Sequence, residues 1–171
     1  IDDAGTVRVY ELPMKGKPRR VTDGSNVGGL ALSANGKVLV GLRESYIEPP
    51  TLVRVDARNG ETTTLGTRNK DALAAIEFGT YESVTYEGAN GVPIQMWVNY
   101  PPGFDKTKRY PAFLLLHGGP HNGITNAFSF RWNAQVFAAR GYVTAWHNFH
   151  GSSGFGQAFT DSINPNQDIL P

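Results

Sequence analysis

Residues 113–123, FLLLHGGPHNG, join an apolar run directly to a histidine, two glycines and a proline. Glycine has no Cβ, so Gly118 and Gly119 can adopt positive φ and let the backbone approach a bound group closely. Pro120 stiffens the turn and removes one N–H donor. Such a loop after a buried strand can aim backbone N–H groups at a developing negative charge, as an oxyanion hole requires. The alternative is a plain Gly-Gly-Pro turn in which His117 ends the strand.

A second glycine-rich stretch, NFHGSSGFGQAF at residues 148–159, follows the next predicted strand. Gly151, Gly154 and Gly156 expose further backbone at the same sheet edge. Phosphate binding is disfavoured, because the spacing fits neither G-x-G-x-x-G nor G-x-x-x-x-G-K-[ST] and no lysine follows.

The elements that position these loops begin near residue 80. Two strands surround a Gly88–Gly91 turn, and residues 110–117 run apolar without alternation, which is typical of a strand buried on both faces. Residues 130–141 predict a helix ended by Gly141, and another strand follows. The predicted helix carries an apolar stripe of Trp132, Val136 and Ala139, widened by Phe137. Strand, helix and strand in this order indicate an α/β domain with a parallel sheet.

The first 70 or so residues predict short antiparallel strands. Asn35-Gly36 and Asn59-Gly60 each separate apolar runs, which is the strongest short hairpin signal. A weak repeat at a spacing of 44 positions also has the size of a four-stranded β-propeller blade, although any antiparallel meander with similar hairpins is the alternative. The repeat relates Val9, Gly16 and Val21 to Val53, Gly60 and Leu65.

Composition narrows the function classes. The 171 residues carry a net charge of +1 and no cysteine, which gives no case for nucleic acid or an anionic membrane and excludes disulfides and thiolate metal sites. No apolar run has the length of a membrane helix. The chain starts without a signal peptide and as though in mid-domain, so a leader could lie upstream, and the compartment stays open between cytoplasm, periplasm and secretion.

Together these stretches resemble the prolyl oligopeptidase family of serine peptidases, most closely its acylaminoacyl-peptidase and bacterial dipeptidyl-peptidase branch. The resemblance is strong over about residues 81–163, and it departs at His150, where the family usually has arginine. It implies C-terminal blades of a β-propeller at 1–75 and the N-terminal part of an α/β-hydrolase domain, truncated before the nucleophile, at 76–171. The matching residues are His117, Gly118, Gly119 and Pro120; Arg140, Gly141 and Tyr142; and Asn148, Phe149, Gly151, Ser152, Ser153, Gly154, Phe155 and Gly156.

The resemblance also implies roles. Gly119 is expected to supply a backbone N–H to the oxyanion hole, with Gly118 and His117 supporting the loop. The chain contains no G-x-S-x-G, and Ser152 and Ser153 lie in a motif that precedes the nucleophile in the family, so neither is expected to attack substrate. The Ser, Asp and His of the triad are expected outside this chain, which alone should be inactive.

The expected partners are a peptide substrate, the remainder of the same hydrolase domain and, as a possibility, a second copy of the protein. No cofactor is expected. The substrate-binding residues stay unassigned, because Glu44, Glu48 and Glu82 are best explained as solvated surface. Without its neighbour, the 112–116 strand is expected to expose an adhesive edge and make the isolated chain prone to aggregate.

Three alternatives remain. Zinc could bind the pairs His117-x₃-His121 and His147-x₂-His150, although no Asp or Glu lies between Asp105 and Asp161 to complete a site. A non-catalytic propeller and hydrolase module is the second. An esterase or lipase sharing the His-Gly-Gly loop is the third, and the propeller-like start argues against it.

Overall fold

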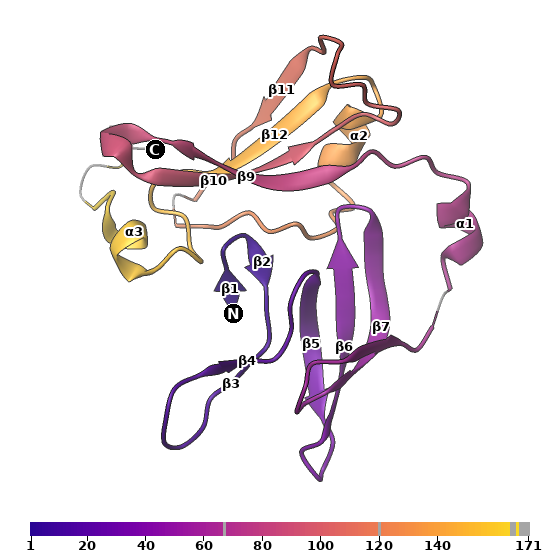
Figure 1. Ribbon diagram of the computed structural model, residues 1–171, viewed down its shortest axis with the longest axis vertical. Helices are drawn as coiled ribbons and strands as arrows, with labels where there is room; N and C mark the ends of the chain where they lie inside the picture. The colour runs from indigo at the N-terminus through magenta and orange to yellow at the C-terminus, as the bar shows by residue number, and fades with distance from the viewer. Residues whose placement is uncertain (67, 120, 165–166, 168–171) are drawn as a thin grey trace. The chain divides into compact units, whose positions relative to one another are not determined.

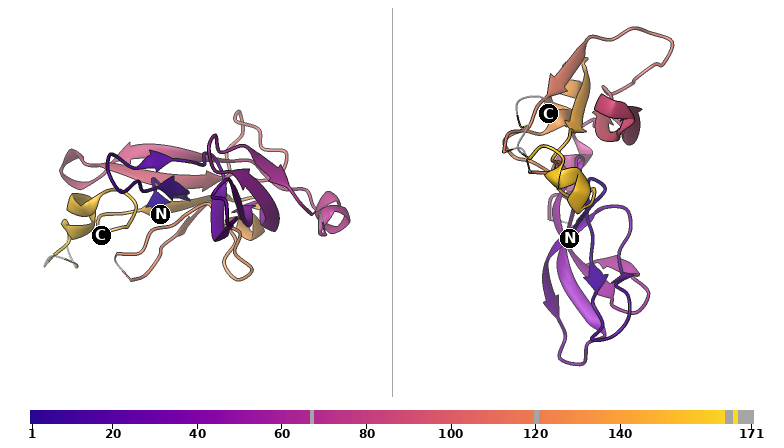
Figure 2. Two further views of the ribbon diagram at one scale, coloured as in Figure 1. Left: turned by 90° about the horizontal axis from the view of Figure 1, so that it is seen from below. Right: turned by 90° about the vertical axis from the view of Figure 1, so that its left-hand side faces the viewer.

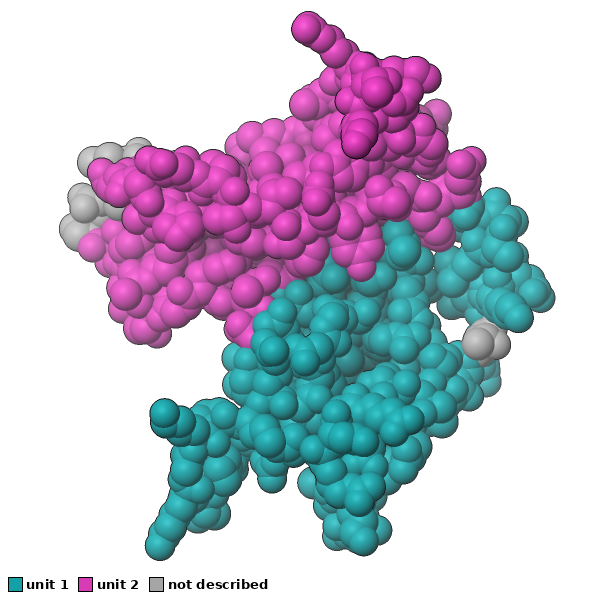
Figure 3. Space-filling view, in the orientation of Figure 1, with its two compact units in different colours: residues 1, 6–76, 125–128 teal, residues 2–5, 77–124, 129–171 magenta. Residues whose placement is uncertain are grey.

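The computed structural model describes residues 1–66, 68–119, 121–164 and 167. It divides the chain into two compact units, which Figure 3 shows in different colours. The first unit consists of residues 1, 6–76 and 125–128, and the second of residues 2–5, 77–124 and 129–171.

Short strands dominate both units (Figure 1). Up to residue 76 the elements are β1 (Asp2–Asp3), β2 (Thr6–Val7), β3 (Tyr10–Glu11), β4 (Arg19–Arg20), β5 (Asn26–Leu32), β6 (Val38–Ser45), β7 (Glu48–Asp56), β8 (Thr62–Thr64) and α1 (Lys70–Ala74). They continue with β9 (Tyr81–Glu87), the 3₁₀ turn η1 (Ala89–Gly91), β10 (Pro93–Asn99), β11 (Ala112–Leu115), α2 (Ala134–Ala138), β12 (Val143–Asn148) and α3 (Gln157–Asp161). None of the helices in the described ranges has the length and apolar character that crossing a membrane requires.

The main sheet of the first unit is a four-stranded antiparallel meander, β5-β6-β7-β8, in which neighbours in sequence are neighbours in space. Figure 2 gives two further views of its strands. Both predicted hairpins are confirmed: Gly36 at φ 70° lies between β5 and β6, and Gly60 at φ 76° lies between β7 and β8. Glycine suits these turns because positive φ carries no steric cost there.

One face of this meander forms the core of the first unit. Val53 and Val55 of β7 are fully buried, because alternate residues of a strand point to the same face. Leu42 and Leu52, directly opposite each other in β6 and β7, stay 42% and 46% exposed on the other face. The core cluster consists of Val9, Val21, Val27, Val53 and Val55, with Leu39 packed against it.

The second unit contains a mixed four-stranded sheet in the order β11-β12-β10-β9. β11 and β12 are parallel and are joined through α2, which confirms the predicted strand–helix–strand segment. β9 and β10 form the predicted hairpin around η1. β12 pairs with β10 in antiparallel fashion, so the sheet is mixed, whereas a parallel sheet was expected. The carboxyl ends of β11 and β12 therefore lie at the same edge.

Two predictions about burial are wrong. Three of the four β11 residues are exposed, and Leu114 is 54% exposed, because no described strand pairs with the outer edge of β11. The helix predicted over residues 130–141 is shorter than expected, since α2 spans Ala134–Ala138. Its predicted apolar stripe is exposed, with Trp132, which precedes α2, at 52% and Val136 at 63%. Instead α2 buries Ala134, Gln135 and Ala138, because small side chains allow the helix to approach β10 and β12 closely. Gly141 adopts φ 87° after the helix, as predicted.

Candidate functional site

The His-Gly-Gly loop leaves the sheet at the carboxyl end of β11. Gly119 adopts φ 61°, a left-handed conformation that favours glycine, and it is exposed. Among the described residues, none accepts a hydrogen bond from its backbone N–H. The N–H is thus available to a ligand, and its use as an oxyanion donor stays a prediction. The expected stiffening by Pro120 lies outside the described residues.

The carbonyl group before that N–H is held by two side chains. The Nδ2 amide of Asn122 donates to the Gly118 oxygen at 3.1 Å, and His117 Nδ1 lies 3.3 Å from the same oxygen. The backbone N–H of Asn122 also donates to the Gly119 oxygen at 2.7 Å, which closes a tight turn. Asn122 was not singled out from the sequence. An asparagine three residues after a Gly-Gly pair was the available signal, because asparagine commonly hydrogen-bonds nearby backbone groups.

His117 lies between this loop and the one after β12. Its Nε2 is 3.1 Å from the Ser152 hydroxyl, and its ring stacks on Phe149 with the centroids 4.1 Å apart. Burial lowers the pKa of His117 below its ordinary value, and the hydrogen bond with the Gly118 carbonyl opposes that shift. A neutral ring protonated on Nδ1 satisfies both contacts, since it donates to Gly118 and accepts from Ser152.

The roles expected for these residues can now be compared with their positions. His117 contacts the Gly118 carbonyl within the loop, and the supporting role expected of both residues stays a prediction. Ser152 is fully buried and its hydroxyl is engaged by His117, which places it poorly for attack on a substrate. Ser153 is partly exposed and donates to Asp2 at 3.4 Å. The Ser152–His117 pair has the spacing of a serine and its base, but complete burial keeps the Ser152 hydroxyl out of reach of a substrate.

Asn148 ties the two glycine-rich loops to the sheet. Its side chain is completely buried, accepts from the Ile124 N–H at 2.6 Å and donates to the Ile124 oxygen at 2.9 Å. It also donates to Gln95 Oε1 at 2.5 Å. A Cβ built on Gly123 would lie 2.6 Å from the Ser153 oxygen, so the loops are in close contact and glycine is required there.

Two further histidines lie beside this edge, His147 half-buried and His150 buried. His147 Nδ1 lies 2.8 Å from the Tyr86 hydroxyl, and burial together with nearby His117 lowers the pKa of His147. His150, where the resemblance implies an arginine, is 4% exposed and its Nδ1 lies 3.3 Å from the Ser162 hydroxyl. Its ring stacks on Phe159 of α3. The imidazole therefore packs α3 against the loop, whereas an arginine would place a longer side chain with five N–H donors at this position.

The histidine pairs do not form a metal centre in the described part of the chain, where no group of three or more His, Cys, Asp or Glu side chains is placed to hold an ion. Each histidine contacts a neighbour instead: His117 contacts Ser152, His121 the Gly151 oxygen, His147 Tyr86 and His150 Ser162. The zinc alternative thus lacks a ligand set among these residues.

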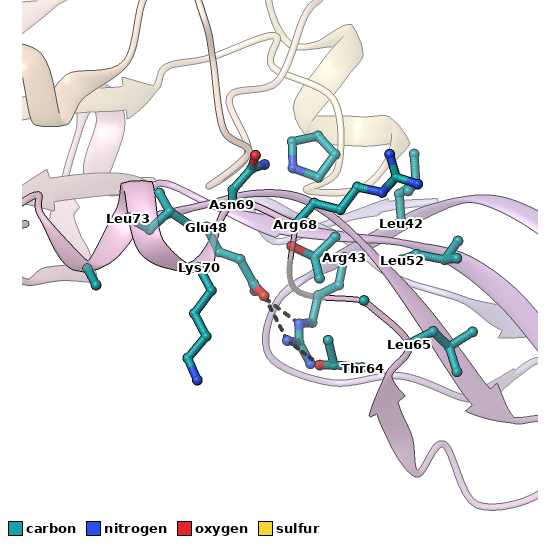
Figure 4. Close-up of a pocket in the computed structure, with 14 residues that line it drawn as sticks. Leu42, Arg43, Glu48, Leu52, Thr64, Leu65, Arg68, Asn69, Lys70 and Leu73 are labelled. Carbon is teal, nitrogen blue, oxygen red and sulfur yellow. Dashed lines mark hydrogen bonds and ion pairs between the residues drawn. The ribbon is translucent and has the colours of Figure 1, made fainter.

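A hollow of about 570 Å³ lies beside the His-Gly-Gly loop, near the carboxyl ends of β11 and β12. Its lining combines apolar and polar side chains and includes His117, Gly118, Asn122, Leu115, Trp132 and Ser153. A larger hollow of about 890 Å³ lies in the first unit, between the exposed leucines of β6 and β7 and helix α1 (Figure 4). Its Arg43 and Glu48 are paired with each other at 2.8 Å, and no described residue of the His-Gly-Gly loop lines it, so the smaller hollow is the better candidate.

Comparison with solved structures shows the class of fold. The chain superposes on the acylaminoacyl peptidase of Pyrococcus horikoshii with a TM-score of 0.75 and 21% identity, over 92% of this chain and 24% of that one. It superposes on dipeptidyl peptidase 4 of Porphyromonas gingivalis with a TM-score of 0.71 and 19% identity, over 94% and 23% respectively. The fold is therefore one that these peptidases contain.

Sequence comparison gives the family. Residues 128–168 match the model of the prolyl oligopeptidase family. Over 156 residues the chain is 35% identical to dipeptidyl-peptidase 5 of Porphyromonas endodontalis, covering 91% of this chain and 22% of that protein. It is 31% identical to the probable dipeptidyl-peptidase 5 of Aspergillus niger, covering 96% and 23%. The predicted resemblance to the prolyl oligopeptidase family is thus confirmed, and the chain spans less than a quarter of the length of these curated relatives.

Proposed function

We propose that this chain is part of a serine peptidase that cleaves peptide bonds near the N-terminus of short peptides, as a dipeptidyl-peptidase or acylaminoacyl-peptidase would. The observation that carries the proposal is Gly119. It lies exposed at the carboxyl end of a parallel strand, in a left-handed conformation, with its N–H unclaimed by any described acceptor. The relatives named dipeptidyl-peptidase 5 support the choice of substrate class.

In the proposed reaction, a serine hydroxyl attacks the peptide carbonyl while a histidine takes its proton and an aspartate orients that histidine. The carbonyl oxygen becomes an anion, and the Gly119 N–H donates a hydrogen bond to it. The serine, histidine and aspartate are assigned to the part of the protein outside residues 1–171, because the relatives are more than four times as long as the segment they share with this chain.

The same proposal assigns the two units. The second unit supplies the start of an α/β-hydrolase sheet, and the strand that carries the nucleophile is proposed to pair with the outer edge of β11. That strand and its flanking helices would cover Leu114 and adjoin the hollow beside His117. The first unit supplies propeller blades, and a neighbouring blade would cover the exposed face of Leu42 and Leu52.

The test uses the full-length protein that contains this chain. It is incubated with a fluorophosphonate probe, which labels reactive serines. Hydrolysis is followed on two chromogenic substrates, a dipeptide nitroanilide and an N-acylated amino-acid nitroanilide. We expect labelling of one serine, and we expect replacement of that serine by alanine to abolish hydrolysis. Absence of both labelling and hydrolysis would favour a non-catalytic binding module. Hydrolysis of simple esters but not of either peptide substrate would favour an esterase.

A further inference from the structure

The Gly118–Gly119 peptide group is held on one side only. Its carbonyl oxygen receives the Asn122 amide at 3.1 Å and lies 3.3 Å from His117 Nδ1, while its N–H has no described acceptor. In a trans peptide the C=O and N–H bonds point in opposite directions. Two donors that fix the carbonyl therefore also fix the direction of the N–H, which points away from them.

From this geometry we infer that Asn122 and Ser152 are positioning residues for the reaction proposed above. Asn122 holds the Gly118 carbonyl directly. Ser152 acts through His117: its hydroxyl lies 3.1 Å from Nε2 and can donate to it, while the Gly118 carbonyl, which only accepts, selects the ring form whose proton lies on Nδ1. The inference rests on the proposed role of the Gly119 N–H as an oxyanion donor.

Close packing supports this assignment. A Cβ built on Gly119 would lie only 2.6 Å from Asn122 Nδ2, so the amide is packed directly against the peptide group. Ser152 is completely buried and His117 stacks on Phe149, which leaves the ring little freedom to rotate. Donors on the carbonyl also polarise the peptide group, which makes its N–H a stronger donor in turn.

The experiment measures hydrolysis by the full-length protein and by four variants, one of which is a matched control. Asn122→Asp keeps the size of the side chain but replaces the amide donor by a carboxylate, which repels the Gly118 carbonyl and attracts the Gly119 N–H. We expect kcat to fall at least about tenfold with KM within about twofold, since loss of one oxyanion donor costs about 10²–10³ in kcat. Ser152→Ala is expected to lower kcat less, in the same direction.

The double variant separates positioning from general loosening. Both residues act on one peptide group, so the loss in kcat of Asn122→Asp combined with Ser152→Ala should be smaller than the product of the single losses. Asn59→Asp is the matched control, because it makes the same charge change in the β7–β8 turn and its carboxylate can still accept from the Glu61 N–H. That control should keep the kcat of the unmodified protein.

The inference is overturned if the unmodified protein hydrolyses peptides and Asn122→Asp has the same kcat. Inactivity of the unmodified protein would instead refute the proposed function. In that event a crystal structure of the full-length protein decides the positioning claim by itself. A Gly118 carbonyl directed at Asn122 and His117, and turned away in Asn122→Asp, would sustain it, and any other orientation in the unmodified protein would overturn it.

Discussion

Substituting Gly119 by alanine should damage catalysis more than stability. The φ of 61° costs an alanine about 1–2 kcal/mol. In addition, the new Cβ would lie 2.6 Å from Asn122 Nδ2, where ordinary contact begins at 3.4 Å, so the amide must retreat by about 0.8 Å. That movement would stretch its 3.1 Å bond to the Gly118 oxygen beyond hydrogen-bonding length.

A matched control is present in the same unit. Gly103 adopts φ 65°, and a Cβ built there meets no atom within 4 Å. Gly103→Ala therefore carries the same backbone strain without displacing a neighbour. We expect both variants of the full-length protein to lower the thermal midpoint by a similar amount, within about 1 kcal/mol of each other in stability.

The catalytic assay should separate the two variants. Gly119→Ala is expected to lower kcat about 10- to 100-fold, because the oxyanion donor is misdirected, while Gly103→Ala keeps the kcat of the unmodified protein. Equal kcat values for the two variants would refute the reasoning, since the displacement of Asn122 would then have no effect on the reacting group.

Three further predictions concern the same unit. Burial lowers the pKa values of His117 and His147 in the folded state, so the stability of the fold should fall as pH drops from about 6.5 through these lowered values. Thermal midpoints measured between pH 8 and pH 5 should therefore decrease less in His147→Gln than in the unmodified protein. Asn148→Ala removes the hydrogen-bond partner of the Ile124 N–H, the Ile124 C=O and the Gln95 side-chain oxygen. Denaturant unfolding should show a loss of about 3 kcal/mol in the free energy of unfolding. A loss below about 1 kcal/mol would show that water replaces these bonds. The chain of residues 1–171 made alone should self-associate in light scattering through Phe113 and Leu114, and Leu114→Lys should reduce this, whereas a monomer with a sharp cooperative melt would contradict the prediction.

The sequence predicts local features of this fold well, because their causes are local. The hairpins at Gly36 and Gly60 follow from the positive φ that a tight turn needs, and the end of α2 follows from Gly141. Burial is different, because it depends on what covers a side chain. The run of residues 113–116 is apolar enough for a central strand, yet its outer edge has no described partner. The face of α2 was misjudged for a related reason: size, rather than apolarity, decided that Ala134 and Ala138 face the sheet.

In the candidate site, too, local features could be predicted from the sequence and contacts between distant residues could not. Gly119 could be predicted, since glycine is the residue that a left-handed loop requires. The hydrogen-bond partners of Asn122 and Asn148 could not be predicted, because a side-chain amide can bond any nearby donor or acceptor and the sequence does not say which one is near. Only the fold brings Asn148 to Ile124, 24 positions away in sequence, and Ser152 to His117, 35 positions away. Sequence therefore located the flexible part of the loop but not the groups that restrain it.

That restraint is what the proposed chemistry needs from glycine-rich backbone. Glycine permits the conformation of Gly119 but also permits many others, and a donor that must reorient during the reaction gives up part of its stabilising effect. The two donors on the Gly118 carbonyl remove this freedom in advance, and burial keeps His117 neutral so that its Nε2 can accept from Ser152. A substrate would then meet an N–H whose direction is already fixed. The hydrogen bonds of Asn122, His117 and Ser152 are thus as necessary to the proposed oxyanion site as the two glycines.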